Sequence, residues 1–235
     1  MSFFVPLVIL VILVVGVLTL YMSYQRRKEL VAWSARNGLT FSPGRDASVD
    51  SRFPDFKCLW RGDSRYAYNV MRGNWHQPGD DDDPLPTGAT TLPVLAFDYH
   101  YVTGSGKNRT TYNFSAVVVE SPIPLEPLFI RPEGFFDKVT EFFGADDIDF
   151  ESAEFSREFY VKSPNKRWAF DVIHQRMMTF LMSVPRFHVQ FASRHVIAWR
   201  GKRFGPADFG SAIRLIRGML KRLPDYVVRK QLGQN

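Results

Sequence analysis

The chain has 235 residues, of which 45% are hydrophobic and 15% aromatic, and 30 Lys and Arg face 24 Asp and Glu for a net charge of +6. This composition excludes a disordered chain, because 21 Phe residues supply a packed interior. The single cysteine, Cys58, excludes an intrachain disulfide and agrees with a reducing compartment. The moderate basic excess suits an anionic membrane surface at least as well as nucleic acid.

An apolar run from Phe3 to Tyr24 contains no charged residue and no His, and Arg26, Arg27 and Lys28 follow it. A helix needs about 20 apolar residues to cross a hydrocarbon core about 30 Å thick, so the run predicts one transmembrane helix. A cleaved signal peptide is the alternative. It is disfavoured because no basic residue precedes the run and no small-residue cleavage site follows it. Residues 1–28 are therefore expected to be a membrane anchor with a basic flank.

Lys and Arg beside a span are held on the cytoplasmic side, so Arg26, Arg27 and Lys28 are the expected topology determinants. They predict a single-pass protein of the cell membrane with its N-terminus outside. Residues 29–235 are then a cytoplasmic domain, with a core large enough for independent folding.

The first predicted elements after the span lead to a hairpin. A helix continues from Arg26 to about Gly38, and a flexible acidic loop covers about residues 75–90, with three prolines and four consecutive aspartates. The strongest strand pattern is the alternation in Thr91–Val102 and Thr110–Glu120, which predicts an antiparallel hairpin with a glycine-rich tip. Two β-like runs are expected before the loop, Phe53–Trp60 and Arg65–Met71.

The second half is expected to alternate strands and helices. Ser121–Glu133 is extended by its prolines, with a possible edge strand at Leu128–Ile130. Further expected strands are Ile148–Phe150, Phe159–Lys162, and a second hairpin from Phe187–Phe191 and Val196–Trp199. Expected helices are Phe135–Phe143, Asn165–Met182 with Ser163 as its N-cap, and Pro206–Leu223. The elements together predict the α+β class, with a mostly antiparallel sheet and packed helices.

No motif assigns a catalytic, cofactor-binding or metal-binding residue. Gly104–Lys107 superficially resembles a phosphate-binding loop, but Tyr101 occupies the first glycine position and Asn108 replaces the Ser or Thr after the lysine. A hairpin tip is the better interpretation. Nucleic-acid binding is disfavoured, because acidic residues interleave with the aromatic ones and no RNA-binding motif occurs.

The C-terminal helix carries a basic stripe of Arg214, Arg217, Lys221 and Arg222 beside an apolar one. Core packing with the basic residues in water is the ordinary interpretation. A domain tethered by a short linker would also stay concentrated at the anionic leaflet, where each basic residue contributes about 1 kcal/mol. The stripe is therefore a candidate lipid-facing surface.

Several motifs together resemble a known group of proteins. They are Leu95–Tyr101 with Thr103–Lys107, Ile130–Gly134, and Asp149–Ser152 leading to Phe155, Phe159 and Val161. This combination resembles an uncharacterised family of membrane-anchored proteins common in actinobacteria. It is also similar to a bacterial domain-of-unknown-function group with an F-x3-F-x-V motif before a helix. The resemblance covers most of Leu30 to Met182 and implies bacterial origin and a membrane anchor, with no activity, cofactor or catalytic residue.

The sequence favours a non-catalytic module that binds an unknown protein partner or the anionic head groups of the membrane. The alternative is a membrane-anchored hydrolase whose site is assembled from scattered residues such as Asp98, His100 and Glu120, because active sites converge in space. Enzymatic activity is thus left open at this stage, with the binding module preferred.

Overall fold

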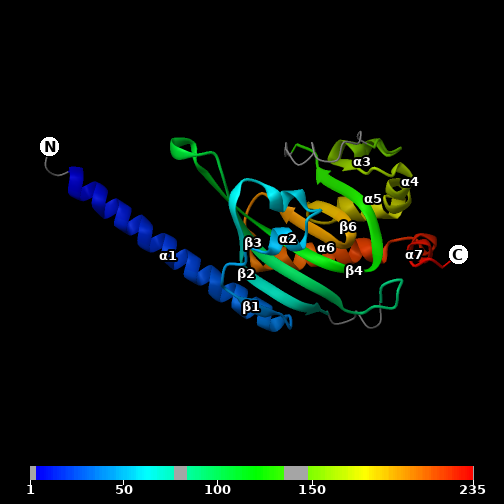
Figure 1. The fold of residues 1–235 in the computed structure, drawn as a ribbon, viewed down its shortest axis with the longest axis horizontal. Helices are drawn as coiled ribbons and strands as arrows, with labels where there is room; N and C mark the ends of the chain where they lie inside the picture. Colours follow the sequence, from blue (N-terminus) through cyan, green and yellow to red (C-terminus); the bar gives the residue numbers. More distant parts are fainter. Residues whose placement is uncertain (1–3, 77–83, 135–147, 235) are drawn as a thin grey trace.

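The computed structural model describes residues 4–76, 84–134 and 148–234, and side chains from Leu7 onward (Figure 1). Six strands form one antiparallel sheet with helices packed against it, which confirms the α+β class. The strands are β1 (Thr40–Ser42), β2 (Asp63–Trp75), β3 (Leu92–Thr103), β4 (Thr110–Pro132), β5 (Phe159–Lys162) and β6 (His188–Arg200). The helices are α1 (Phe4–Arg36), α2 (Val49–Arg52), α3 (Ala153–Glu158), α4 (Lys166–Val172), α5 (Gln175–Ser183), α6 (Pro206–Lys221) and α7 (Asp225–Gln231), with 3-10 turns η1 (Lys57–Trp60) and η2 (Gly106–Asn108).

Strand β4 is the centre of the sheet. Its first half pairs with β3 on one side and β6 on the other, and its second half lies between β5 and β6. Strands β2 and β1 extend the sheet beyond β3, so the order is β1-β2-β3-β4-β5 with β6 added at β4. The β3–β4 hairpin is confirmed, with an unbroken register from Val94 opposite Val119 to Thr103 opposite Thr110.

Alternation along the strands gives the sheet two buried faces. On one face, Ala96 and Val117 pack with the C-terminal part of α1 and with α6. On the other, Phe97 and Ala116 pack under the segment that contains α2 and η1. A strand buried on both sides tolerates few polar residues, and the exceptions therefore point to specific partners.

Helix α1 is a single helix of 33 residues that serves both the anchor and the domain. Counted from Leu7 to Arg36, it is long and apolar enough to cross a membrane. Further along, Leu30 and Trp33 are buried, and the Trp33 ring stacks on Trp75 with ring centroids 5.8 Å apart. It ends at Asn37–Gly38 as predicted, where Gly38 takes a φ of +67°. The domain boundary expected at residue 28 therefore falls inside a continuous helix.

One predicted strand and one predicted hairpin are replaced by other structures. Residues 53–60 are not a strand: Pro54 lacks the N–H that a ladder needs, and Lys57–Trp60 forms a 3-10 turn. The predicted turn at Ser193 lies inside one continuous strand, β6, in which Ser193 has a φ of +53°. Both halves of β6 pair with β4 and not with each other, and the extra residues of the irregular register lie on β4, between Glu120 and Leu128.

Other boundaries also differ from expectation. Leu128–Ile130 is interior, because it has β6 on one side and β5 joins it from Phe129 on the other. The predicted helix Asn165–Met182 is two helices, α4 and α5, and its N-cap is Asn165, whose side chain accepts the N–H of Trp168 at 3.1 Å. Residues 148–150 are not a strand, and α7 was not expected. The predicted helix at 135–143 and the aspartate run at 80–83 lie outside the described residues.

Candidate functional site

The anchor helix is joined to the sheet by a buried ion pair. Arg26 on α1 reaches Asp98 on β3, with Nη1 2.5 Å from Oδ2 and Nη2 2.8 Å from Oδ1. The Asp98 side chain is fully buried, whereas 18% of the Arg26 side chain is exposed. Two parallel N–H···O bonds between a guanidinium and a carboxylate fix orientation as well as distance.

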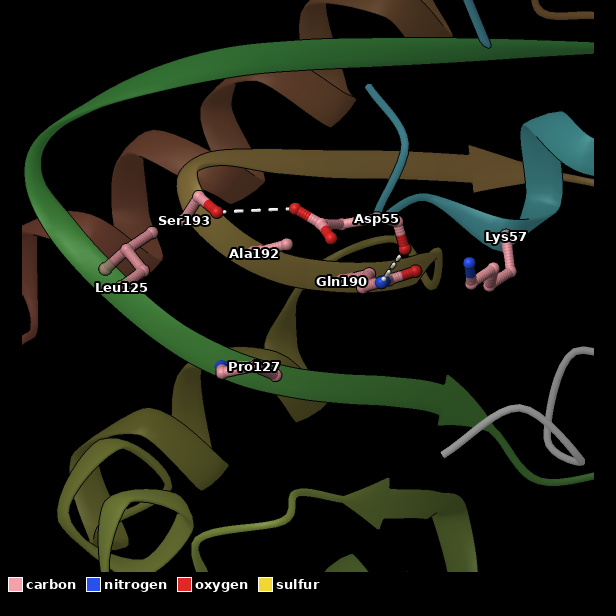
Figure 2. A pocket seen from close by; sticks show the side chains of 7 residues that line it. All are labelled: Asp55, Lys57, Leu125, Pro127, Gln190, Ala192 and Ser193. Atoms are coloured by element: carbon pink, nitrogen blue, oxygen red, sulfur yellow. Dashed lines mark hydrogen bonds between the residues drawn. The ribbon is translucent and has the colours of Figure 1, made fainter. Parts of the chain in front are cut away.

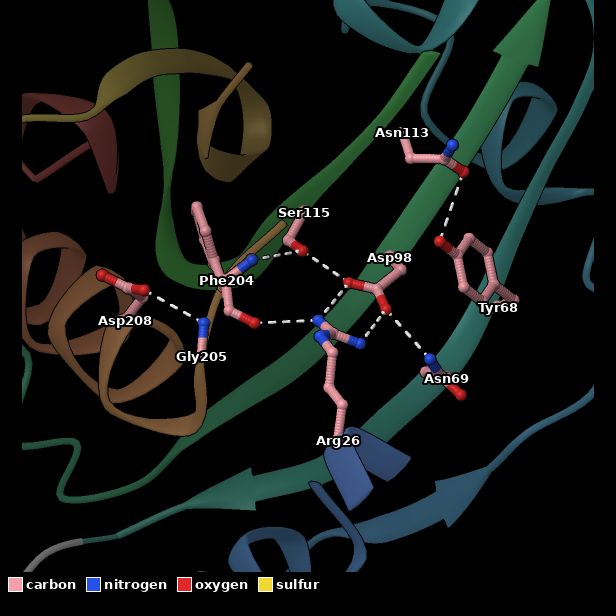
Figure 3. A network of polar contacts seen from close by, with 9 residues as sticks. All are labelled: Arg26, Tyr68, Asn69, Asp98, Asn113, Ser115, Phe204, Gly205 and Asp208. Carbon is pink, nitrogen blue, oxygen red and sulfur yellow. Dashed lines mark hydrogen bonds and ion pairs between the residues drawn. The ribbon is translucent and has the colours of Figure 1, made fainter. Parts of the chain in front are cut away.

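Neighbouring segments complete the hydrogen bonding of Asp98 (Figure 3). Asn69 on β2 donates from Nδ2 to Oδ2 at 2.9 Å, and Ser115 on β4 donates from Oγ to Oδ1 at 2.5 Å. The loop before α6 also joins, because the Phe204 carbonyl accepts from Arg26 at 2.8 Å and the Phe204 N–H donates to Ser115 at 2.8 Å. We call these five residues the anchor joint.

Burying a carboxylate is costly unless nearby donors satisfy its oxygens. In the anchor joint each oxygen of Asp98 accepts two hydrogen bonds, one of them from Arg26. Asn69 reaches its position with a φ of +49°, a left-handed backbone conformation that asparagine tolerates better than most residues. The arrangement ties α1, three strands and one loop together through one charged group.

The anchor joint lies directly beside the apolar run of α1. Arg26 follows Tyr24, the last residue of the predicted span, by two positions, or about 3 Å of helix rise. In a bilayer crossed by that span, the ion pair would lie at the level of the head groups, whose region is about 5–7 Å deep on each side of the hydrocarbon core. The expectation of a short linker is wrong, because α1 continues unbroken into the domain. Of the three predicted topology determinants, Arg26 is paired internally, and Arg27 and Lys28 are exposed.

The residues suggested for a scattered hydrolase site do not meet. Asp98 is occupied by the anchor joint, and His100 stacks on Tyr66 with ring centroids 4.5 Å apart. Glu120 lies opposite His195 on β6, five residues along β4 from Ser115, the partner of Asp98. Five strand residues span about 16 Å, so Glu120 is remote from the other two carboxyl and imidazole groups.

A groove runs over β6 on the face of the sheet opposite α6. Three adjoining hollows of about 310, 390 and 240 Å³ make it up, and they share lining residues. The segment from Phe53 to Lys57 forms one wall, β6 forms the floor, and β4 forms part of the far side through Leu125 and Pro127. We call the three hollows together the Asp55 groove, and Figure 2 shows the first of them.

The floor of the Asp55 groove contains a buried acceptor that lacks a partner. Gln190 is 2% exposed and donates from Nε2 to the Asp55 carbonyl at 2.8 Å. Its Oε1 receives no hydrogen bond among the described residues. Figure 2 shows the Asp55 carboxylate pointing instead to Ser193, whose Oγ lies 3.3 Å from Asp55 Oδ2. A buried unsatisfied acceptor costs about 1–3 kcal/mol.

His195 lines the second and third hollows, beside Phe53, whose ring it meets edge-on with centroids 5.0 Å apart. Burial lowers the pKa of this imidazole, and the nearby Glu120 carboxylate opposes that shift in part. The imidazole is therefore neutral at pH 7, able to donate one hydrogen bond and accept another. Sequence analysis missed this groove, because its residues come from separate segments and none belongs to a recognisable motif.

The predicted basic stripe on α6 has mixed surroundings. Arg214 is exposed, Arg217 is only 9% exposed, and Lys221 is half-buried. Arg222 stacks over the Phe180 ring, with its guanidinium carbon 3.9 Å from the centroid, and bonds the Gly218 carbonyl. In Figure 1, the C-terminal end of α6 lies toward the end of the molecule opposite the N-terminus of α1.

Within the described ranges, no group of three or more His, Cys, Asp or Glu side chains is placed to hold a metal ion. Gly104–Lys107 occupies the tip of the β3–β4 hairpin, with η2 followed by a strand, as the sequence predicted.

The sequence matches no protein-family model and no curated protein. Among solved structures, the chain is similar to the crystal structure of the mycobacterial trehalose monomycolate transport factor A, TtfA. The TM-score is 0.55 at 13% sequence identity, over 84% of this chain and 96% of that one. At this identity the likeness concerns the fold.

Proposed function

We propose that this chain is a single-pass membrane protein whose domain acts as a non-catalytic binding module, an accessory factor that holds a protein partner at the membrane. The observation that carries the proposal is the anchor joint, which connects an apolar helix of membrane-spanning length to the centre of the sheet without a linker. Scaffolding needs fixed geometry, and a continuous helix tied by a bidentate ion pair supplies it.

A rigid anchor determines which surface of the domain the partner meets. On a flexible tether, a domain samples many orientations and gains only effective concentration. Here the sheet keeps one height and one angle relative to α1, because Arg26 and the buried Trp33 both fix it. The Asp55 groove is then presented to the same compartment at a constant distance from the bilayer.

The Asp55 groove is our candidate for the partner site. Its apolar lining includes Phe53, Leu125 and Ala192, and its polar groups include the exposed carboxylate of Asp55, which is an acceptor. An extended polypeptide segment offers backbone N–H donors between apolar side chains, which matches this lining. The Lys57 ammonium lines the same hollow as the Asp55 carboxylate and can donate to a backbone carbonyl of such a segment.

The structural neighbour is a transport factor, which supports a non-enzymatic role. We extend that role to this chain as part of the proposal, together with an actinobacterial relationship. The preferred orientation is domain in the cytoplasm, because Arg27 and Lys28 remain exposed beside the span.

The test is co-purification of partners from native membranes with the tagged full-length chain. Asp55→Asn combined with Lys57→Ala alters the exposed and half-buried lip of the groove without touching the core, and is expected to lose the partner. Lys202→Ala, an exposed change outside the groove, is the matched control and should retain it. Equal recovery with all three proteins would show that the groove is not the partner site. If no protein is enriched over an anchor-only control, the binding-module proposal itself fails.

A further inference from the structure

The β3–β4 hairpin extends toward the membrane end of the molecule. In Figure 1 its tip lies on the same side as the N-terminal half of α1, well beyond the rest of the sheet. The register gives a scale for this projection. Thr103 is five residues beyond Asp98, so about 16 Å of extended strand separates the tip from the anchor joint.

This projection matters because the anchor joint already lies at head-group level. Arg26 follows the predicted span by two residues, and Asp98 is held against it. A strand that starts at this level and is strongly inclined to the membrane normal keeps its tip at the bilayer surface, because the head-group region is only about 5–7 Å deep. The tip can therefore meet lipid without any movement of the domain.

The chemistry of the tip fits an anionic surface. Residues 104–113 are all exposed and include Lys107 and Arg109. No Asp or Glu occurs from residue 99 to residue 119, so no acidic side chain within the hairpin neutralises these two cations. Each basic residue near an anionic leaflet strengthens binding roughly fivefold.

Exposed aromatic side chains flank the same tip. Tyr112 is 43% exposed and stacks on Tyr101, with ring centroids 4.9 Å apart. Trp60 is 40% exposed. It lies near the tip, because Gly62, two residues further on, packs so closely on the Val102 carbonyl that a Cβ there would collide with it. Tyr and Trp concentrate at membrane interfaces because their rings are apolar and their polar groups remain hydrated.

We infer that the β3–β4 tip is a second membrane contact, in which Lys107 and Arg109 bind the anionic head groups of the bilayer that α1 crosses. The inference rests on the proposed membrane anchoring and adds a lipid-binding surface to it. It assigns the lipid contact to the hairpin in place of the α6 stripe, where Arg217 is buried and Arg222 packs on Phe180. With two points of contact, rotation of the domain about α1 is also restricted.

The experiment uses the full-length chain in nanodiscs of phosphatidylcholine, with or without phosphatidylglycerol. Ser105→Cys carries an environment-sensitive fluorophore at the tip, and the native Cys58 is buried and stays unlabelled. Lys230→Cys, on the exposed side of α7, is the matched control label. Accessibility to iodide in the aqueous phase is the readout.

We expect the tip label to be protected from iodide in the anionic discs and the Lys230 label to be accessible in both. Lys107→Glu with Arg109→Glu should remove the protection. The binding of the tip to the anionic surface should weaken at least about 25-fold, because loss of each positive charge alone weakens it roughly fivefold. Arg214→Glu on α6 should leave it unchanged.

Equal iodide access at Ser105 in both lipids would overturn the inference, as would loss of protection in Arg214→Glu alone. Resistance to alkaline carbonate extraction, measured on the same samples, separates this outcome from failure of the anchor. A chain that stays integral but has an accessible tip keeps the proposed anchored module and loses only the second contact.

Discussion

The anchor joint makes a quantitative prediction about stability. Replacing Arg26 with Met keeps the apolar length of the side chain and removes the cation, which leaves Asp98 buried with only its donors from Asn69 and Ser115. Removing one partner of a buried ion pair typically costs about 3–5 kcal/mol. Asp98→Asn should cost less, about 1–3 kcal/mol, because Arg26 is 18% exposed and keeps the Phe204 carbonyl.

The double variant measures the coupling. When Arg26→Met and Asp98→Asn are combined, no unpaired charge remains, so the loss should fall short of the sum by about 0.5–3 kcal/mol. Urea unfolding of the full-length chain in detergent gives each free energy of unfolding. Tryptophan fluorescence is a suitable signal, because the stacked Trp33 and Trp75 connect α1 to β2.

Arg27→Met is the matched control, since Arg27 is the adjacent exposed residue on the same helix. It should change the free energy of unfolding by less than about 0.5 kcal/mol. A loss below about 1 kcal/mol for Arg26→Met, or strict additivity of the two changes at the joint, would show that α1 is not fixed to the sheet by this ion pair. The rigid-anchor argument would then be wrong.

Three further predictions concern the groove and the hairpin. The pKa of His195, followed by NMR, should lie below its usual 6.5. The unfolded state then binds a proton more readily, so the folded state loses stability as the pH falls through 6.5, and His195→Gln should reduce that loss. Unchanged acid sensitivity in this variant would contradict the assignment. Gly104→Ala should destabilise the hairpin more than Gly106→Ala, because both have positive φ but only the first places a Cβ against a carbonyl, and amide exchange at the tip should rank them. Ser193→Gly should raise the free energy of unfolding by up to about 1 kcal/mol, because glycine adopts a positive φ without strain. A clearly lower melting temperature of this variant would show that Ser193 is not strained.

The apolar helix of membrane-spanning length and the β3–β4 hairpin were determined by local sequence. Hydrocarbon thickness sets the length of a span, and strict alternation around a glycine-rich turn admits essentially one pairing. The amphipathic helix α6 was also recognisable from its period. In each case the signal lies within one continuous segment.

Tertiary structure decided the rest, because long-range pairing overrides local preference. Ser193 resembles a turn residue in the sequence, yet β4 is long enough to pair with β6 on both sides of it, so the two halves of β6 do not pair with each other. Arg26 resembles a free juxtamembrane charge, yet Asp98, 72 residues away, binds it. The first hollow of the Asp55 groove is assembled from three separate segments. A sequence read locally gives an apolar helix of membrane-spanning length, whereas the rigid connection between this helix and the sheet arises only when the fold brings these two charges together.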